Sequence, residues 1–381
     1  DIRAPIDLPP FDKAVMDGYA VRAEDTFGAR PDRPVRLRLV GRALAGHPAP
    51  PVGPGECVEV STGSMLPEGA NAVVRVEAKS VEGREVLVHE PVVPGQDVID
   101  VGADIGKGEV VLRAGDVLTP ARLGALSSLG LKSVRVFRRP LVAVISTGVE
   151  LVMPGEPLRP GKIYDINWIT VCSAIRMALC EPLFVGTAHD DPGELAEMMA
   201  RGLSRADVLI ATGASSVGSS DIVREALSAL GACIIIDGVR VKPGKPTIVA
   251  EADGKPLFCL PGHPMSALMT FLVFVEPVLA SMAGLAGIGR PEVRARLASR
   301  IIPDVGRHNF VPVRLSRGPR GLTAHPILKG SGAITSLSGA DGYVEVPEGT
   351  EFLPEGEEVL VRLFWPCWPI GRSDLEAQAR G

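Results

Sequence analysis

The distribution of apolar and polar positions divides the chain into three stretches. Residues 1 to about 139 contain short apolar runs between turn residues, which is typical of an irregular, mostly β region, and "TPARLGALSSLG" predicts a helix near its end. From "RPLVAVISTG" onward, strand-like apolar runs alternate with helical patterns. After about residue 288 short strand patterns return, which suggests a small closed β module.

The middle stretch has the clearest pattern. Five segments are strand-like: "LVAVIS", "PLFVGTA", "ADVLIATG", "CIIIDGV" and "PLFCLPG". Four are helix-like: "WITVCSAIRMALC", "PGELAEMMARGLS", "DIVREALSAL" and "PMSALMTFLVFV". Strands that alternate with helices predict a mainly parallel sheet covered by helices on both faces.

Composition and charge narrow the class of protein. The chain has 381 residues and 46% hydrophobic content, enough for two to four domains with large cores. Its net charge of -5 argues against a general nucleic-acid or anionic-membrane binder, because affinity for phosphate backbones comes from clustered Lys and Arg. Any anion site must therefore be local.

Cysteine usage and the apolar runs favour a cytoplasmic protein. The six cysteines include no C-x-x-C pair, so neither a zinc knuckle nor a disulfide framework is indicated. The longest apolar run is interrupted by Glu276 and Pro277, and the N-terminus lacks a basic-then-apolar signal pattern. We expect no membrane partner.

Ligands of open parallel sheets bind outside the carboxyl ends of the strands, where this chain has polar loops. In "TGASSVGSSD", Gly213 and Gly218 permit close backbone approach, and the serines and Asp221 lead into a helix N-terminus that could receive an anion. The same serines or Asp221 could simply cap the helix. No Gly-Lys-Ser/Thr follows, so this is not an ATPase loop.

Two lysines give the sharper signal. Lys242 and Lys245 lie three residues apart in "VKPGKPT", but Pro243 and Pro246 exclude a helix, so this spacing does not describe a solvated helical face. A tight pair of cations fits a small tetrahedral oxyanion or a phosphate, although solvated surface lysines remain the alternative. The neighbouring loop "LPGHPMSA" places Ser266 at a helix start.

The stretch "LPPFDKAVMDGYAVR", residues 8 to 22, is too broken for either a helix or a strand. Its prolines and its glycine turn indicate a surface connection in which Asp12 and Asp17 cap local turns.

Six motifs occur in a fixed order along the chain: "PPFDKAVMDGYAVR", "STGVELVMPGEPL", "IYDIN", "TGASSVGSSD", "VKPGKP" and "LPGHPMSA". Together they resemble the molybdopterin molybdenumtransferase family, the molybdenum insertases related to the gephyrin E domain, from about residue 5 to residue 365. The resemblance implies an elongated N-terminal region (1–24 plus 105–139), an inserted β domain (25–104), an α/β molybdopterin-binding domain (140–287), a C-terminal β domain (288–366) and a tail (367–381).

The resemblance also implies a reaction and an assembly. Molybdate is joined to the dithiolene of adenylylated molybdopterin with release of AMP, assisted by Mg²⁺ or another divalent cation. Family members are homodimers whose active site combines one subunit's α/β domain with N-terminal elements of the other, so that Asp17 would line the partner's site. A molybdopterin adenylyltransferase and molybdoenzyme apoproteins are the implied protein partners.

Residue by residue, the family motifs map onto three sets of positions in this sequence. The catalytic set is Asp17, Asp221, Lys242 and Lys245. The substrate and molybdate set is Ser216, Ser266, Arg307, Gly213, Gly218, Gly262 and His263. The metal set is Asp221 and Glu150. The chemistry agrees, because cations offset the repulsion between molybdate and a phosphate, and carboxylates ligate divalent cations. A loop histidine such as His263 is by itself weak evidence for a site.

The chain departs from the family pattern at several positions. Val149 precedes Glu150 where the family reads "STGDEL", so a carboxylate associated with metal binding and adenylate cleavage is absent. Further departures are Lys13, Ala214, Ser215, Ser219 and His263. Two functions therefore compete: an insertase, or a non-catalytic or weakened protein that binds molybdate or the finished cofactor for a particular apoenzyme. A nucleotide-dependent transferase unrelated to molybdenum is a third.

Overall fold

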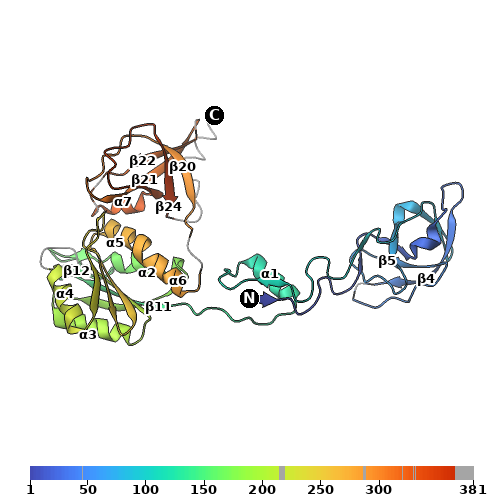
Figure 1. Cartoon of the computed structure of the whole chain (residues 1–381), viewed down its shortest axis with the longest axis horizontal. Coiled ribbons are helices and arrows are strands. Elements are labelled where there is room, and N and C mark those ends of the chain that lie inside the picture. Colours follow the sequence, from blue (N-terminus) through green and yellow to red (C-terminus); the bar gives the residue numbers. More distant parts are fainter. Residues whose placement is uncertain are drawn as a thin grey trace. The chain divides into compact units, whose positions relative to one another are not determined.

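The chain folds as two compact units, Asp1–Val136 and Phe137–Gly381 (Figure 1). The computed structural model describes residues 1–44, 46–213, 219–285, 289–319, 321–328, 330 and 332–364. The multidomain fold class that the sequence predicted is confirmed, with N-terminal domains, a central α/β domain and a C-terminal β domain.

The N-terminal unit is built on one mixed six-stranded sheet of order β6-β3-β5-β4-β8-β7. Its strands are β3 (Gly18–Val21), β4 (Val35–Ala43), β5 (Glu56–Val60), β6 (Ala72–Arg75), β7 (Lys79–Glu82) and β8 (Glu85–Val88). Side chains of β3 alternate between two cores, because Tyr19 and Val21 enter one cluster and Ala20 enters the other. Strand β3 lies within residues 8–22, so the expectation that this stretch forms no strand is wrong. The predicted domain boundary at residue 24 stays a prediction.

Short elements complete the N-terminal unit. Two small antiparallel pairs join distant segments: β1 (Ile2–Arg3) with β10 (Val110–Leu112), and β2 (Lys13–Ala14) with β9 (Val98–Ile99). The 3₁₀ turns η1 (Ala23–Thr26) and η2 (Val76–Ala78) lie within the β region. Helix α1 (Pro120–Ser128) begins after Thr119, whose side chain accepts a hydrogen bond from the backbone N–H of Arg122.

The second unit is centred on a six-stranded sheet of order β14-β11-β15-β19-β18-β16. The first four strands are parallel, whereas β18 and β16 run antiparallel to their neighbours. The bounds are β11 (Leu141–Thr147), β14 (Glu181–Ala188), β15 (Val208–Thr212), β16 (Cys233–Asp237), β18 (Ile248–Ala252) and β19 (Lys255–Leu260). The mainly parallel sheet is thus confirmed, and β18 is a strand that the sequence prediction missed.

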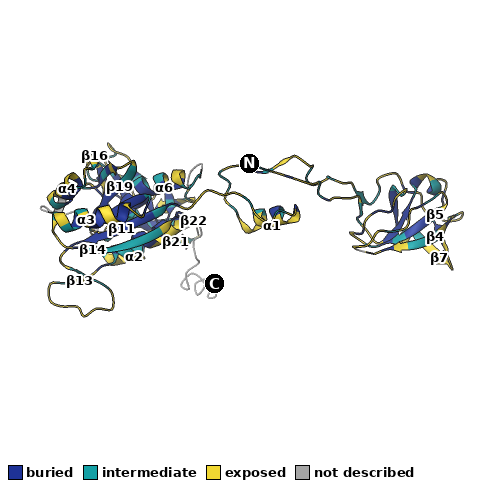
Figure 2. Ribbon diagram, turned by 90° about the horizontal axis from the view of Figure 1, so that it is seen from below, coloured by how far each residue is buried: buried dark blue, intermediate teal, exposed yellow. Residues whose placement is uncertain are grey.

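Helices cover both faces of this sheet (Figure 1). Side chains of β11 point alternately to the two faces, so Val144 packs with α2 (Asn167–Met177) and Ile145 packs with α3 (Pro192–Leu203) and α4 (Ser219–Ala229). Figure 2 shows β11 almost wholly buried, whereas β14 at the sheet edge is intermediate. The short parallel pair β12 (Leu151–Val152) and β13 (Ile163–Tyr164) follows β11.

One long helical segment continues from the sheet to the C-terminal domain. It consists of α5 (Pro264–Thr270), a π-helical turn η3 (Phe271–Val275) and α6 (Glu276–Met282). Its 19 residues are long and apolar enough to cross a membrane, but most of the segment is buried against the sheet. Buried Glu276 is held by two hydrogen bonds from Arg290, which also donates to the carbonyls of Leu363 and Phe364.

The C-terminal β domain is a closed sheet of order β17-β21-β22-β20-β24-β23, in which β21 also pairs with β23. Its strands are β17 (Val241–Lys242), β20 (Glu292–Leu297), β21 (His308–Gly318), β22 (Gly321–Pro326), β23 (Gly342–Val346) and β24 (Glu358–Leu363), with the short helix α7 (Ile334–Ser338). Strand β17 comes from the α/β part of the chain and therefore joins the two domains. Phe310 and Tyr343 pack into the core cluster shared with α5.

Candidate functional site

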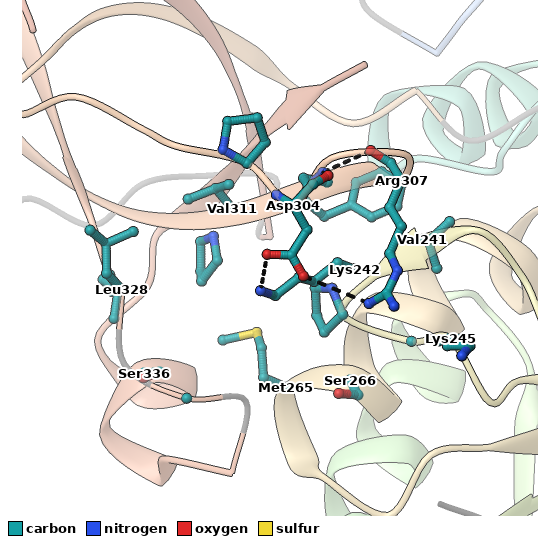
Figure 3. Close-up of a pocket in the computed structure, with 18 of the residues that line it drawn as sticks. Val241, Lys242, Lys245, Met265, Ser266, Asp304, Arg307, Val311, Leu328 and Ser336 are labelled. Carbon is teal, nitrogen blue, oxygen red and sulfur yellow. Dashed lines mark hydrogen bonds and ion pairs between the residues drawn. The ribbon is translucent and has the colours of Figure 1, made fainter. Parts of the chain in front are cut away.

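A cavity of about 370 Å³ lies where the α/β domain meets the C-terminal β domain (Figure 3). The walls come from the turn after β17, the start of α5, the loop before β21 and helix α7. The lining includes the cations Lys242, Lys245 and Arg307 together with apolar residues such as Ile302 and Leu328. The cavity is far larger than a tetrahedral oxyanion requires.

The turn "KPGKP" carries the two lysines. Gly244 has φ +125°, and a Cβ there would lie 2.3 Å from Cγ2 of Thr270 in α5, so only glycine fits this close approach. The Thr247 hydroxyl donates to the Gly244 carbonyl (2.7 Å), and the Val239 N–H donates to the Lys245 carbonyl (2.9 Å). The turn therefore holds both lysine backbones at the cavity wall, while their side chains remain exposed.

Ser266 lies in the first turn of α5. It is 5% exposed and lines the cavity, and its carbonyl accepts a hydrogen bond from the Thr270 hydroxyl (2.8 Å). The first backbone N–H groups of a helix have no partner within the helix, so the start of α5 can present donors beside the Ser266 hydroxyl.

Arg307 is positioned by a buried asparagine on the neighbouring strand. The side chain of Asn309 accepts from the Asp304 N–H (3.0 Å) and donates to the carbonyls of Asp304 (3.1 Å) and Arg307 (2.8 Å). Asn309 also stands beside Lys242 in the β17–β21 pairing. The loop with Arg307 is thereby fixed next to Lys242.

One carboxylate links two of the cations. Oδ1 of Asp304 lies 2.6 Å from Nζ of Lys242, and Oδ2 lies 3.7 Å from Nη1 of Arg307 (Figure 3). All three side chains are between 38% and 52% exposed, so water weakens these ion pairs. Counting Lys245, the cavity carries three cations and one anion from these residues, a net charge of +2.

The structure thus brings Lys242, Lys245, Ser266 and Arg307 together around one cavity. The sequence analysis missed three further residues there: Asp304, Asn309 and Ser336. Ser336 is 1% exposed, and its hydroxyl has no hydrogen-bond partner among the described residues. No spacing signal marks Ser336 or Asn309, whereas the acid three positions before Arg307 could have been noticed.

The glycine loop is described only at its ends, because residues 214–218, with Ser216 and Gly218, lie outside the described residues. A Cβ on Gly213 would lie 2.2 Å from the Thr147 carbonyl oxygen, so this position requires glycine. Asp221 in α4 is exposed and pairs with Arg224 (3.1 Å). Arg224 also binds Asp237 through two hydrogen bonds, which lower the pKa of Asp237.

The loop after β11 carries Val149 and Glu150. The Val149 side chain is about half exposed, and its carbonyl accepts a hydrogen bond from the Lys162 ammonium. The Glu150 carbonyl accepts from the Ile163 N–H (2.8 Å), so its exposed carboxylate is carried on a loop fixed to β13. Within the described ranges, no three His, Cys, Asp or Glu side chains form a metal-binding group. The metal roles of Asp221 and Glu150 stay predictions.

Buried polar residues fix the loop that contains Gly262 and His263. The side-chain amide of Asn167 donates to the Gly262 carbonyl (2.7 Å), and Asp165 accepts from the N–H groups of Asn167 (3.0 Å) and Trp168 (3.3 Å). His263 is exposed and directly precedes α5. Asp165 and Asn167, which lie in the motif "IYDIN", therefore position the loop that leads to Ser266.

Asp17 belongs to the N-terminal unit. Its carboxylate accepts hydrogen bonds from the backbone N–H (2.7 Å) and the hydroxyl (3.0 Å) of Thr62, and these bonds lower the pKa of Asp17. Because Thr62 is 45 positions away in the sequence, Asp17 joins two distant segments of the N-terminal unit, and these contacts are not the local turn cap that the sequence suggested. The carboxylate is exposed and ionised at neutral pH.

Three family models match the chain in order. They are the MoeA N-terminal region (domain I and II) at residues 1–130, a probable molybdopterin binding domain at 143–281 and the MoeA C-terminal region (domain IV) at 294–364. A protein of Mycobacterium tuberculosis H37Rv called molybdopterin molybdenumtransferase 2 is 35% identical over 95% of this chain and 90% of its own length. The chain belongs to the molybdopterin molybdenumtransferase family.

A further relative and a solved structure support the same family. The molybdopterin molybdenumtransferase of Haemophilus influenzae is 36% identical over 81% of this chain and 76% of its own length. The crystal structure of a molybdopterin biosynthesis MoeA protein from Pyrococcus horikosii superimposes with a TM-score of 0.86 at 44% identity, covering 97% of this chain and 91% of that protein. The family predicted from the motif order is confirmed.

Proposed function

We propose that this protein is a molybdopterin molybdenumtransferase in molybdenum cofactor biosynthesis. It transfers molybdenum from molybdate to adenylylated molybdopterin and releases AMP. The observation that carries this proposal is the cavity in which Lys242, Lys245 and Arg307 gather beside Ser266, in a chain that belongs to this family.

The cavity chemistry supports molybdate as the oxyanion. Molybdate is a dianion and must approach a substrate that carries phosphate, so the three cations offset the repulsion between two negative reactants. Ser266 and Ser336 line the same cavity, and the Ser266 hydroxyl can donate a directional hydrogen bond. The cavity also has apolar lining residues such as Ile302 and Leu328, and its volume leaves room for part of the larger substrate.

Mg²⁺ or another divalent cation is part of this proposal. Carboxylate oxygens are the ligands that Mg²⁺ prefers, and Asp221, Glu150 and Asp17 are exposed carboxylates on loops or at a helix start. When bound, the cation would neutralise charge on the adenylate phosphate. Val149 cannot add a ligand, so this chain supplies one carboxylate fewer there than the family pattern.

A homodimer completes the proposed active site. In a two-fold dimer both sites are equivalent, and each would combine the cavity of one subunit with Asp17 of the partner subunit. We further propose a cytoplasmic location, with a molybdopterin adenylyltransferase supplying the substrate and molybdoenzyme apoproteins receiving the product. Neither nucleic acid nor a membrane is a partner in this proposal.

A second function is favoured by Val149 alone. A protein that binds molybdate or the finished cofactor, without efficient adenylate cleavage, would retain the cations and lose the acid. Single-turnover AMP release from adenylylated molybdopterin and molybdate separates the two functions. The insertase proposal expects AMP release by the wild type, more slowly than by an acid-bearing homologue, and faster release by Val149→Asp. Tight substrate binding without AMP release, by both the wild type and Val149→Asp, would favour the binding-protein function.

The shared site has its own test. Asp17→Ala and Lys242→Ala subunits are each expected to be impaired, whereas a heterodimer of the two regains one intact site. Verified heterodimers that show no recovery, or a fully active monomer in light scattering, would contradict the shared active site.

A further inference from the structure

Asp304 occupies the place where an oxyanion would meet two of the cavity's cations. Its two carboxylate oxygens face different partners, Lys242 at 2.6 Å and Arg307 at 3.7 Å (Figure 3). A carboxylate that bridges an ammonium and a guanidinium resembles, in charge and in oxygen geometry, one edge of a tetrahedral anion.

The Asp304 carboxylate is not needed to hold the loop. Asn309 bonds only to backbone groups of Asp304 and Arg307, and it is 3% exposed. The loop geometry therefore does not depend on the charge of residue 304. The ion pairs of Asp304 are also partly exposed, so their contribution to folding is small.

We propose that Asp304 is an internal competitor of the oxyanion and sets both the affinity and the charge preference of the site. This inference rests on the proposed function, because it assigns molybdate to the same cavity. A bound dianion takes Lys242 and Arg307 from Asp304, and the displaced carboxylate remains nearby as a repelling charge. The residue thus lowers the affinity for the oxyanion and favours its release.

Charge provides the sharpest test of this role. Coulomb energy is proportional to the product of the charges, so one nearby carboxylate opposes a dianion twice as strongly as a monoanion. Molybdate and perrhenate are both tetrahedral oxyanions of similar size, with charges of -2 and -1. The cost of displacing Asp304 is the same for both anions, but the remaining repulsion is larger for the dianion, so removal of the carboxylate should raise the molybdate affinity by a larger factor than the perrhenate affinity.

The experiment is calorimetric titration of the full chain with molybdate and with perrhenate, for wild type and Asp304→Asn. Because water and salt screen these half-exposed groups, we expect Asp304→Asn to bind molybdate about tenfold and perrhenate about threefold more tightly. The amide keeps the size of the side chain and removes its charge.

Glu348→Gln is the matched control. Glu348 pairs with Arg240, two positions before Lys242, and does not line the cavity. Its neutralisation removes the same charge from the same domain, and it should change either affinity by less than about twofold. An equal gain in Asp304→Asn and Glu348→Gln would show a general field effect and overturn the role of Asp304.

The remaining outcomes separate this inference from the proposed function. Unchanged or weaker molybdate binding by Asp304→Asn, with a wild type that binds, would overturn the inference alone. Equal gains for molybdate and perrhenate would also overturn it. If neither protein bound molybdate, the proposed function would fail and the inference with it. Binding by Asp304→Asn only would support both.

Discussion

The cationic and the acidic candidate residues of the second unit are organised differently. Lys242 and Lys245 on one turn and Arg307 on a segment far away in the sequence share one cavity. Asp221 and Glu150, in contrast, lie on separate exposed segments, and Asp221 is paired with Arg224. In the proposed function, capture of the oxyanion therefore needs residues of one subunit only, whereas a grouping of acids around a metal would form with the substrate, with the cation or with the proposed partner subunit.

The cationic part depends on the junction between the α/β and C-terminal domains. Three features hold that junction: the β17–β21 pairing, the close approach of Gly244 to Thr270, and the bonds of Arg290 to Glu276 and to the end of β24. If this comparison is right, substitutions that destabilise the junction should weaken oxyanion binding, and substitutions of the acids should not.

The largest effect is expected from Glu276→Ala. Arg290 is 14% exposed and would lose its charged partner, and breaking a buried pair in this way costs about 3 to 5 kcal/mol of unfolding free energy. Urea unfolding would measure this loss. Glu292→Ala, which breaks a half-exposed pair with Arg362, should cost less than about 1 kcal/mol. Similar losses in the two variants would contradict the role of the Arg290 junction.

The second largest effect is expected from Gly244→Ala. Its φ of +125° and the 2.3 Å contact with Thr270 should together cost about 3 kcal/mol and displace both lysines. Molybdate affinity should fall along with stability. Gly254→Ala is the control, because that glycine also has positive φ but has nothing within 4 Å of the added Cβ. Equal stability loss in both variants would show that packing on Thr270 is unimportant.

A smaller effect concerns the pH dependence of stability, at the end of the central sheet opposite the cavity. Arg138 and the Leu141 N–H bind Asp207 and hold its pKa below the ordinary value. Because the folded-state pKa is lower than the unfolded value of about 4, this stabilisation is complete above that pH and is lost as the pH falls through the folded-state pKa. Stability of Asp207→Asn should therefore change less between neutral and acid pH than that of wild type. Parallel curves would contradict this account.

The smallest effect is expected from Asp221→Asn. The side chain is 73% exposed, and its pair with Arg224 should contribute less than about 0.5 kcal/mol to stability. Molybdate affinity should stay within about twofold of wild type, because Asp221 does not line the cavity. A tenfold loss of molybdate affinity would place Asp221 in the oxyanion site and would contradict the distinction between the cationic cavity and the separate acids.

The sequence predicted most of the fold because its signals are local. Alternating strands and helices indicated the mainly parallel sheet, and the prolines around Lys242 and Lys245 excluded a helix. Strand β18 was missed because "TIVAEA" is short and is interrupted by Glu251, and strand β3 was missed because it pairs with β5 and β6, which follow it in the sequence. Pairing of this kind is a tertiary property.

The candidate site could likewise be predicted from the sequence only where its signals are local. Lys242, Lys245 and Ser266 stand in motifs with unusual local chemistry, and Arg307 came from the family resemblance. Asp304, Asn309 and Ser336 were missed because their importance arises from the junction of two domains, where a buried asparagine and a buried serine line the cavity. No spacing of residues along the chain indicates that these three residues come together at the junction.

The central claim is that this cavity captures molybdate through its paired lysines, and calorimetric titration of Lys242→Ala/Lys245→Ala with molybdate tests it most directly. Each charge-assisted hydrogen bond is worth roughly 1.5 to 3 kcal/mol, so the double variant should bind molybdate at least about tenfold more weakly than wild type. Its unfolding free energy should change little, because both side chains are exposed. Unchanged molybdate affinity in a folded double variant would contradict the assignment of this site.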